Sequence, residues 1–198
     1  MYKRKIMKKR IIILAVIAQC FIGSHQVSAQ SKIHFVTDIH YLYGLSSTTS
    51  YLTLTRKDVN LYGKSLHLTS LYDFSKSISA GVGIGADRYE NPGFNTLPVF
   101  ASLHYTPFVI THPRTYLFTN LGFGIKNSYA HSGLMFDAGI GYKKMFGRRF
   151  GLNFQLGYNL KQINETPVYI PTADNQSYEL VLVTSTRHSL SLGIGVIF

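Results

Sequence analysis

The chain ends with the stretch Ser189-Leu190-Ser191-Leu192-Gly193-Ile194-Gly195-Val196-Ile197-Phe198. Large apolar side chains occupy its even-numbered positions, whereas serine or glycine occupies the odd-numbered positions up to 195. This period of two is that of a β-strand, in which successive side chains point to opposite faces. The stretch therefore predicts a strand that has one apolar face and one small, polar face and that ends on an aromatic residue.

The same alternation recurs about eight times along the chain. The predicted strands cover residues 32–43, 62–74, 77–87, 97–106, 116–125, 134–143 and 150–161, and a last strand starts after residue 178 and ends at residue 198. Asn91-Pro92-Gly93 is a strong turn signal. Pro98 is expected near the start of its strand or at a bulge, because proline cannot donate to a sheet.

These strands predict an all-β fold, namely an eight-stranded antiparallel transmembrane β-barrel preceded by a signal peptide. Strands of about ten residues are long enough to cross a bilayer when tilted. The sheet has to close on itself, because lipid offers no hydrogen-bond partner to an open edge. Tyrosines such as Tyr41, Tyr72 and Tyr142 fall near strand ends, where aromatic rings favour the headgroup region.

The first residues have the features of an export signal. Six lysines and arginines precede an apolar run over residues 11–18, and Val27-Ser28-Ala29 places small residues at the positions that a signal peptidase reads. We expect cleavage after Ala29, so that residues 1–29 are the signal peptide and residues 30–198 form the barrel. The expected location is the outer membrane.

Most of the excess positive charge belongs to this signal. Its removal leaves 14 basic against nine acidic residues, a net charge of +5 instead of +11. The basic charge that could suggest a nucleic-acid partner therefore belongs largely to the targeting signal, and no nucleic-acid partner is expected. Cys20 leaves with the signal, so the mature chain has no thiol or disulfide chemistry.

The lengths of the connections predict the orientation. Those over residues 45–60 and 162–177 are long, whereas the turns after the second and sixth strands are short, which is typical of barrels with extracellular loops and periplasmic turns. Both termini are then expected in the periplasm, because the strand number is even. We expect a monomer that displays residues 45–60 and 162–177 outside the cell, where an extracellular ligand would bind.

The opposite parity faces the inside of the barrel, and it carries the polar side chains. A narrow lumen would bring these side chains together in a hydrogen-bonded plug, although a narrow water channel is the alternative. Repeats such as Gly81-x-Gly83-x-Gly85 fit the same lumen as small inward residues, not as phosphate loops. The residues expected in the network are Asp38, His40, His67, Asp87, His104, Asn120, Asp137, Asn153 and Gln155.

The export signal, the alternating strands with inward Gly-x-Gly, and the aromatic last strand resemble the small bacterial outer-membrane barrels of the OmpA and OmpX type. Leu97-Pro98-Val99-Phe100 and Tyr116-Leu117-Phe118 are further similar to an outer-membrane β-barrel family common in Bacteroidetes. The resemblance implies a setting of outer-membrane lipid. It also implies that the barrel assembly machinery reads the last strand, with Phe198 as the signal.

Some small barrels of this kind deacylate or palmitoylate lipid A, and His131-Ser132 could reach the membrane rim where such enzymes act. Nucleophilic catalysis needs a base that is itself oriented, and the sequence offers no third partner at a matching spacing. We therefore expect no catalytic, cofactor-binding or metal-binding residues. The expected function is structural or a surface interaction, with a lipid-modifying enzyme or a narrow channel as the alternatives.

Overall fold

A computed structural model describes residues 32–91, 93–107, 114–147, 150–171 and 178–198. The predicted signal peptide, residues 1–29, lies outside the described residues. Within the described ranges, no helix is long and apolar enough to cross a membrane.

The described chain contains ten strands. They are β1 (Ile33–Thr48), β2 (Thr53–Thr55), β3 (Tyr62–Asp73), β4 (Ile78–Glu90), β5 (Phe94–Thr96), β6 (Pro98–Tyr105), β7 (Thr115–Gly124), β8 (Gly133–Met145), β9 (Gly151–Pro171) and β10 (Tyr178–Ile197). Each of the eight predicted strands corresponds to one long strand, and Pro98 is the first residue of β6, as predicted.

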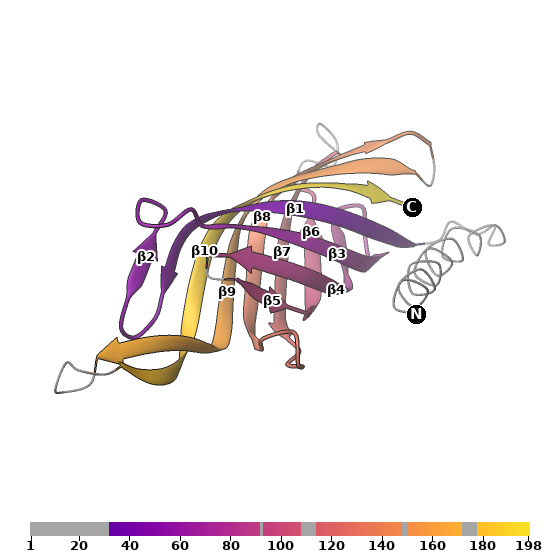
Figure 1. The fold of residues 1–198 in the computed structure, drawn as a ribbon. Helices are drawn as coiled ribbons and strands as arrows, with labels where there is room; N and C mark the ends of the chain where they lie inside the picture. Colours follow the sequence, from indigo (N-terminus) through magenta and orange to yellow (C-terminus); the bar gives the residue numbers. More distant parts are fainter. Residues whose placement is uncertain (1–31, 92, 108–113, 148–149, 172–177) are drawn as a thin grey trace, which may run out of the picture. The chain divides into compact units, whose positions relative to one another are not determined.

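Eight of these strands form a closed antiparallel ring in the order β10-β9-β8-β7-β6-β4-β3-β1 (Figure 1). The ring closes because β1 also pairs with β10, where Ile39 lies opposite Ile194 and His40 lies opposite Gly193. The short strands β2 and β5 extend the ring by pairing with β1 and β4. The predicted eight-stranded antiparallel barrel is confirmed.

The two faces of the wall have the predicted parity. On β1 and β10 the outward residues Ile39 and Ile194 are exposed, whereas the inward residues His40 and Ser191 are buried. Strand β7 has aromatic residues at both parities. There Leu117 faces outward, while Tyr116 and Phe118 are buried inside the ring.

One predicted loop, residues 45–60, is partly sheet. Strand β1 continues to Thr48 and pairs with β2, so that Ser47 lies opposite Leu54. The polar run from Ser46 to Ser50 predicts a loop. Threonine is β-branched, however, and fits a solvated strand that needs no apolar face.

The prediction of a second loop over residues 162–177 is wrong for residues 162–171. Strand β9 extends to Pro171 and pairs with β10 from Tyr178 onward, and residues 172–177 lie outside the described residues. Pro167 and Pro171 suggested a loop. They are tolerated because β9 has no neighbour other than β10 at this level, so no ladder hydrogen bond is lost on its free edge.

A β-bulge separates this hairpin from the barrel wall. Asn164 and Glu165 on β9 lie opposite the single residue Thr184 on β10, and Glu165 has a left-handed φ of 59°. An extra residue in one strand bends the pair and increases its twist. The hairpin accordingly turns away from the direction of the wall strands, as the gold and orange ribbons show (Figure 1).

The turn predicted from Asn91-Pro92-Gly93 is present but shorter than expected. Strand β4 continues to Glu90, and Tyr89 lies opposite Phe94 on β5. Asn91 has a left-handed φ of 57°, which asparagine tolerates better than most residues. Residues 88–90 and 94–96, expected in the connection, are therefore part of the sheet.

The two ends of the barrel differ. The end that carries Lys32, Phe198 and the turns after β3, β6 and β8 is called the terminal end. The end that carries β2, β5, residues 125–132 and the β9–β10 hairpin is called the loop end. The loop end is tied together by backbone hydrogen bonds from His131 to Asn95 (2.8 Å) and from Asn164 to Ser132 (2.9 Å).

Candidate functional site: the polar lumen

The predicted network residues all lie at inward positions of the ring. Eight of them are buried, and His104 is half-buried. The residues are Asp38 on β1, His40 on β1, His67 on β3, Asp87 on β4, His104 on β6, Asn120 on β7, Asp137 on β8, and Asn153 and Gln155 on β9.

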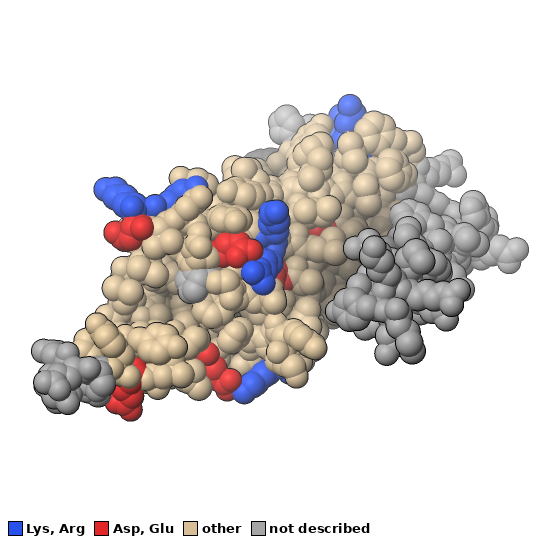
Figure 2. All heavy atoms as spheres, viewed as in Figure 1, with Lys and Arg blue, Asp and Glu red and all other residues tan. Residues whose placement is uncertain are grey.

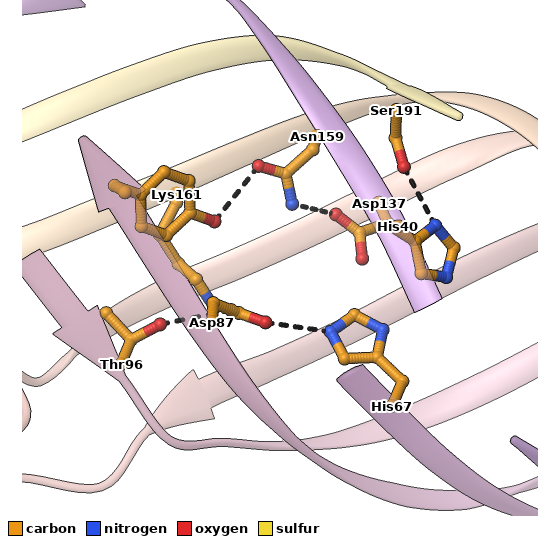
Figure 3. Close-up of polar contacts among 9 residues, drawn as sticks. His40, His67, Asp87, Thr96, Asp137, Asn159, Lys161 and Ser191 are labelled. Atoms are coloured by element: carbon orange, nitrogen blue, oxygen red, sulfur yellow. Dashed lines mark hydrogen bonds and ion pairs between the residues drawn. The ribbon is translucent and has the colours of Figure 1, made fainter. Parts of the chain in front are cut away.

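Asp87 is the centre of the largest cluster (Figure 3). One carboxylate oxygen lies 3.0 Å from Nε2 of His67, and the other forms a 2.8 Å ion pair with Nζ of Lys161. Thr96 donates a third contact of 3.0 Å to the second oxygen. The side chains of Asp87 and Lys161 are almost fully shielded from solvent, so neither charge can be compensated by water.

A second group of hydrogen bonds is centred on Asn159. The amide of Asn159 donates to Asp137, and its carbonyl accepts a 3.2 Å hydrogen bond from the hydroxyl of Tyr89 (Figure 3). Tyr89 and Asp137 are buried and come from β4 and β8. The hydrogen bond from Tyr89 to Asn159 on β9 therefore bridges two strands, β4 and β9, that are not neighbours in the ring.

A third group lies nearer the terminal end. Asn153 donates to Asp38 (2.7 Å) and accepts from the hydroxyl of Tyr116 (2.5 Å). The amide of Gln155 donates to the same hydroxyl at 3.0 Å. These four residues come from β1, β7 and β9, and they satisfy one another across the lumen.

The remaining predicted residues differ in what they contact. Nδ1 of His40 lies 2.9 Å from Oγ of Ser191, and its ring lies 5.2 Å from that of His67. His104 stacks on Tyr116 with ring centroids 4.6 Å apart. Asn120 lies opposite Asp137 in the register, and its side-chain oxygen has no hydrogen-bond partner among the described residues.

Inward glycines make room for this network. A Cβ at Gly193 would lie 2.6 Å from the His40 ring, and a Cβ at Gly141 would lie 2.1 Å from Tyr116. Contacts this short do not occur between real atoms, so the neighbouring ring would have to move. The Gly-x-Gly repeats thus have the steric role that was predicted for them.

Buried apolar side chains lie inside the ring on both sides of the polar groups. Leu42, Tyr89, Phe94 and Ile163 form a buried cluster toward the loop end. Val36, Leu71 and Ile197 form another toward the terminal end. These inward apolar residues were not predicted, because strict alternation reserves that parity for polar side chains.

Several polar partners are missing from the predicted network: Thr96, Asn159 and Arg187, with the hydroxyls of Tyr89 and Tyr116. Asn159 has the same inward parity as Lys161, and this signal could have included it. Tyr89 lies beyond the predicted end of its strand. Arg187 is buried, donates to the carbonyl of Tyr62 (3.1 Å) and lies over the Tyr89 ring at 5.5 Å.

His131 and Ser132 do not form a nucleophile and base pair among the described residues. Both contact Asn164. Nδ1 of His131 lies 2.9 Å from the backbone carbonyl oxygen of Asn164, and the side-chain amide of Asn164 donates to Oγ of Ser132 at 3.2 Å. This arrangement gives no support to the hydrolase hypothesis. Within the described ranges, no group of three His, Cys, Asp or Glu residues could hold a metal ion.

No protein-family model matches the chain, and neither does any curated protein sequence. Among solved structures, it is similar to the outer membrane protein OprG from Pseudomonas aeruginosa, with 13% identity over 85% of this chain and 96% of that chain (TM-score 0.44). It is also similar to Neisserial surface protein A, with 17% identity over 83% of this chain and 97% of that chain (TM-score 0.43).

A third similar structure is Ail, the attachment invasion locus protein of Yersinia pestis, solved in complex with the heparin analogue sucrose octasulfate. The identity is 16% over 84% of this chain and 99% of that chain, with a TM-score of 0.44. The chain's own pairing of β1 with β10 defines it as an eight-stranded antiparallel β-barrel.

Proposed function

We propose that this protein is an integral outer-membrane β-barrel that acts as a closed frame and displays its loop end outside the cell. The observation that carries the proposal is the contrast between the two faces of one wall. Large apolar side chains are exposed on the outside, while carboxylates, histidines and a lysine are buried on the inside. A soluble protein would have the reverse arrangement.

The height of the apolar band fits a membrane. The outward positions from Leu66 on β3 to Phe74, the first residue after it, follow Lys64 without a further charge at that parity. Nine residues at about 3.3 Å each, tilted by about 40°, cover roughly 23 Å, close to the apolar band of membrane barrels. On the side of the molecule seen in Figure 2, much of the wall carries no charged side chains.

The loop end supports the display role. The β9–β10 hairpin presents one face made of Pro167, Tyr169, Pro171, Tyr178, Leu180 and Leu182, all exposed. Tyr51 and Leu52 are exposed beside β2. These side chains lie beyond the apolar band, so they are available to an extracellular partner.

The last strand supports assembly by the barrel machinery. Phe198 ends the chain next to the terminal end, exchanges backbone hydrogen bonds with Phe35 (2.8 and 3.0 Å) and stacks on its ring at 5.9 Å. Outer-membrane lipid surrounds the wall, and the barrel works as a monomer. The resemblance to barrels of the OmpA and OmpX type and to the Bacteroidetes family belongs to this proposal.

The closed lumen is tested by reconstitution in planar bilayers. Because Asp87, Lys161 and the two apolar clusters fill the ring, the folded protein should show no steady conductance above the bare bilayer. Unheated and heated samples of the same preparation are compared on a gel, to show that the protein added is folded. Reproducible open-channel steps from the folded fraction would contradict the closed lumen and favour the narrow channel.

A further inference from the structure

The terminal end of the barrel is strongly basic. Five cations lie there among the described residues: Lys32, Lys76, Arg114, Lys143 and Lys144. The acidic side chain among the described residues of this end is Asp73. The charge is therefore concentrated on one rim of the molecule.

Besides Asp73, the anion at this end among the described residues is the terminal carboxylate of Phe198, so the cations outnumber the anions. Asp73 is already engaged by Nδ1 of His34 (3.5 Å) and by the hydroxyl of Ser79 (2.5 Å). None of the five cations forms an ion pair with an acidic side chain of the described residues. Such an unpaired group needs an external anion or bulk solvent.

The loop end behaves differently. Arg88 pairs with Glu90 at 2.9 Å, and Lys126 pairs with Glu165 at 2.5 Å. With Arg56, Lys57 and Lys64, and apart from the buried Arg187, the described loop end has five cations, and Asp58, Glu90, Glu165 and Glu179 offset four of them. Figure 2 shows blue and red atoms together at this end. The excess of positive charge is thus a property of the terminal end.

Two of the basic side chains lie at the depth of the aromatic residues. Nζ of Lys32 is 5.8 Å from the ring centroid of Tyr72, and Nζ of Lys144 is 5.5 Å from that of Phe146. Both rings are exposed at the edge of the apolar band. Aromatic rings and long cationic side chains occupy this level when they meet lipid headgroups.

We propose that the basic rim formed by Lys32, Lys76, Arg114 and Lys144 binds the phosphate groups of anionic phospholipids in the periplasmic leaflet. This inference rests on the proposed membrane location. Lys143 is left out because its Nζ lies over the ring of the buried Tyr116. Lipid is favoured over a soluble anion because the cations adjoin exposed rings that continue the lipid-facing wall.

The test uses the folded barrel in vesicles and a local fluorescent reporter. The chain has no tryptophan, so Phe146→Trp reports the lipid beside the basic rim, and Leu134→Trp reports the opposite end. Each is quenched by brominated phosphatidylglycerol or brominated phosphatidylcholine at equal mole fraction. We expect phosphatidylglycerol to be enriched up to about fivefold at Phe146→Trp, and not at Leu134→Trp.

Neutral variants separate the rim from net charge. Changing Lys32, Lys76, Arg114 and Lys144 to Gln should abolish the enrichment. Changing Lys57, Lys64, Arg88 and Lys126 to Gln removes the same charge from the loop end and should leave it unchanged. Equal quenching by the two lipids in the parent, or equal loss in both variants, would overturn the proposal. The proposal would also be overturned if the parent showed no lipid enrichment but co-sedimented with isolated cell wall, and only the rim variant lost this co-sedimentation.

Insertion into vesicles of phosphatidylcholine alone, read by the difference between heated and unheated migration on a gel, tests the proposed function separately. All variants should insert there, because the wall itself is unchanged. Insertion without enrichment contradicts only the lipid proposal. A parent chain that never inserts contradicts the membrane barrel and the lipid proposal together.

Discussion

Arginine in place of Ile194 is expected to destabilise the folded barrel by about 2–4 kcal/mol in lipid vesicles. Ile194 is the middle one of the five outward positions from Leu190 to Phe198 on β10 and is 54% exposed in the isolated chain. A guanidinium there would lie at the centre of the hydrocarbon, where water cannot solvate it. The free energy of unfolding is measured by urea titration of the refolded protein.

Leu182→Arg is the matched control. Leu182 lies on the same strand with the same outward parity and is 60% exposed, but it belongs to the hairpin beyond the apolar band. The same substitution should cost about 0–1 kcal/mol there. If the wall faced water, the two exposed positions would respond alike. Equal effects of the two variants would therefore contradict a membrane setting.

Replacement of Asp87 by alanine is expected to cost about 3–5 kcal/mol, the effect of removing one partner from a buried ion pair. The substitution leaves the buried ammonium of Lys161 without its carboxylate and also removes the partner of His67. The consequence is a lower midpoint of urea unfolding and a smaller folded fraction on a semi-native gel.

A double variant distinguishes an unpaired charge from simple loss of packing. In Asp87→Ala combined with Lys161→Met, the unpaired ammonium is gone, and most of the stability should return because apolar groups can replace buried ion pairs. Asp58→Ala is the control for an exposed carboxylate, since Asp58 accepts hydrogen bonds from the N–H and the hydroxyl of Thr55 at the loop end. An unchanged midpoint in Asp87→Ala would show that the pair does not stabilise the lumen.

The sequence contained enough information for the wall of the barrel. Strict alternation along Leu190 to Val196 determines which face of β10 meets lipid, since a shift of one residue would turn every apolar side chain of this stretch inward. Connection lengths then separate the two ends. The same local signal failed at residues 162–171, because a hairpin that leaves the wall accepts prolines that a central strand would exclude.

The lumen could be predicted only as a set of residues. Parity places Asp87, His67 and Lys161 inside, but which of them touch depends on how strands distant in the sequence are staggered around the ring. The contact of Tyr89 with Asn159 joins residues 70 positions apart. No periodicity indicates such a pair.

The central claim is that the chain is a sealed barrel seated in the outer membrane. Its most direct test is migration of the protein from an isolated outer-membrane fraction on a semi-native gel, with and without boiling. The account predicts that the unheated chain remains in the membrane fraction and migrates faster than the boiled chain, because the closed ring is compact and resists the detergent. Identical migration of the two samples, or recovery of the chain in the soluble periplasmic fraction, would contradict it.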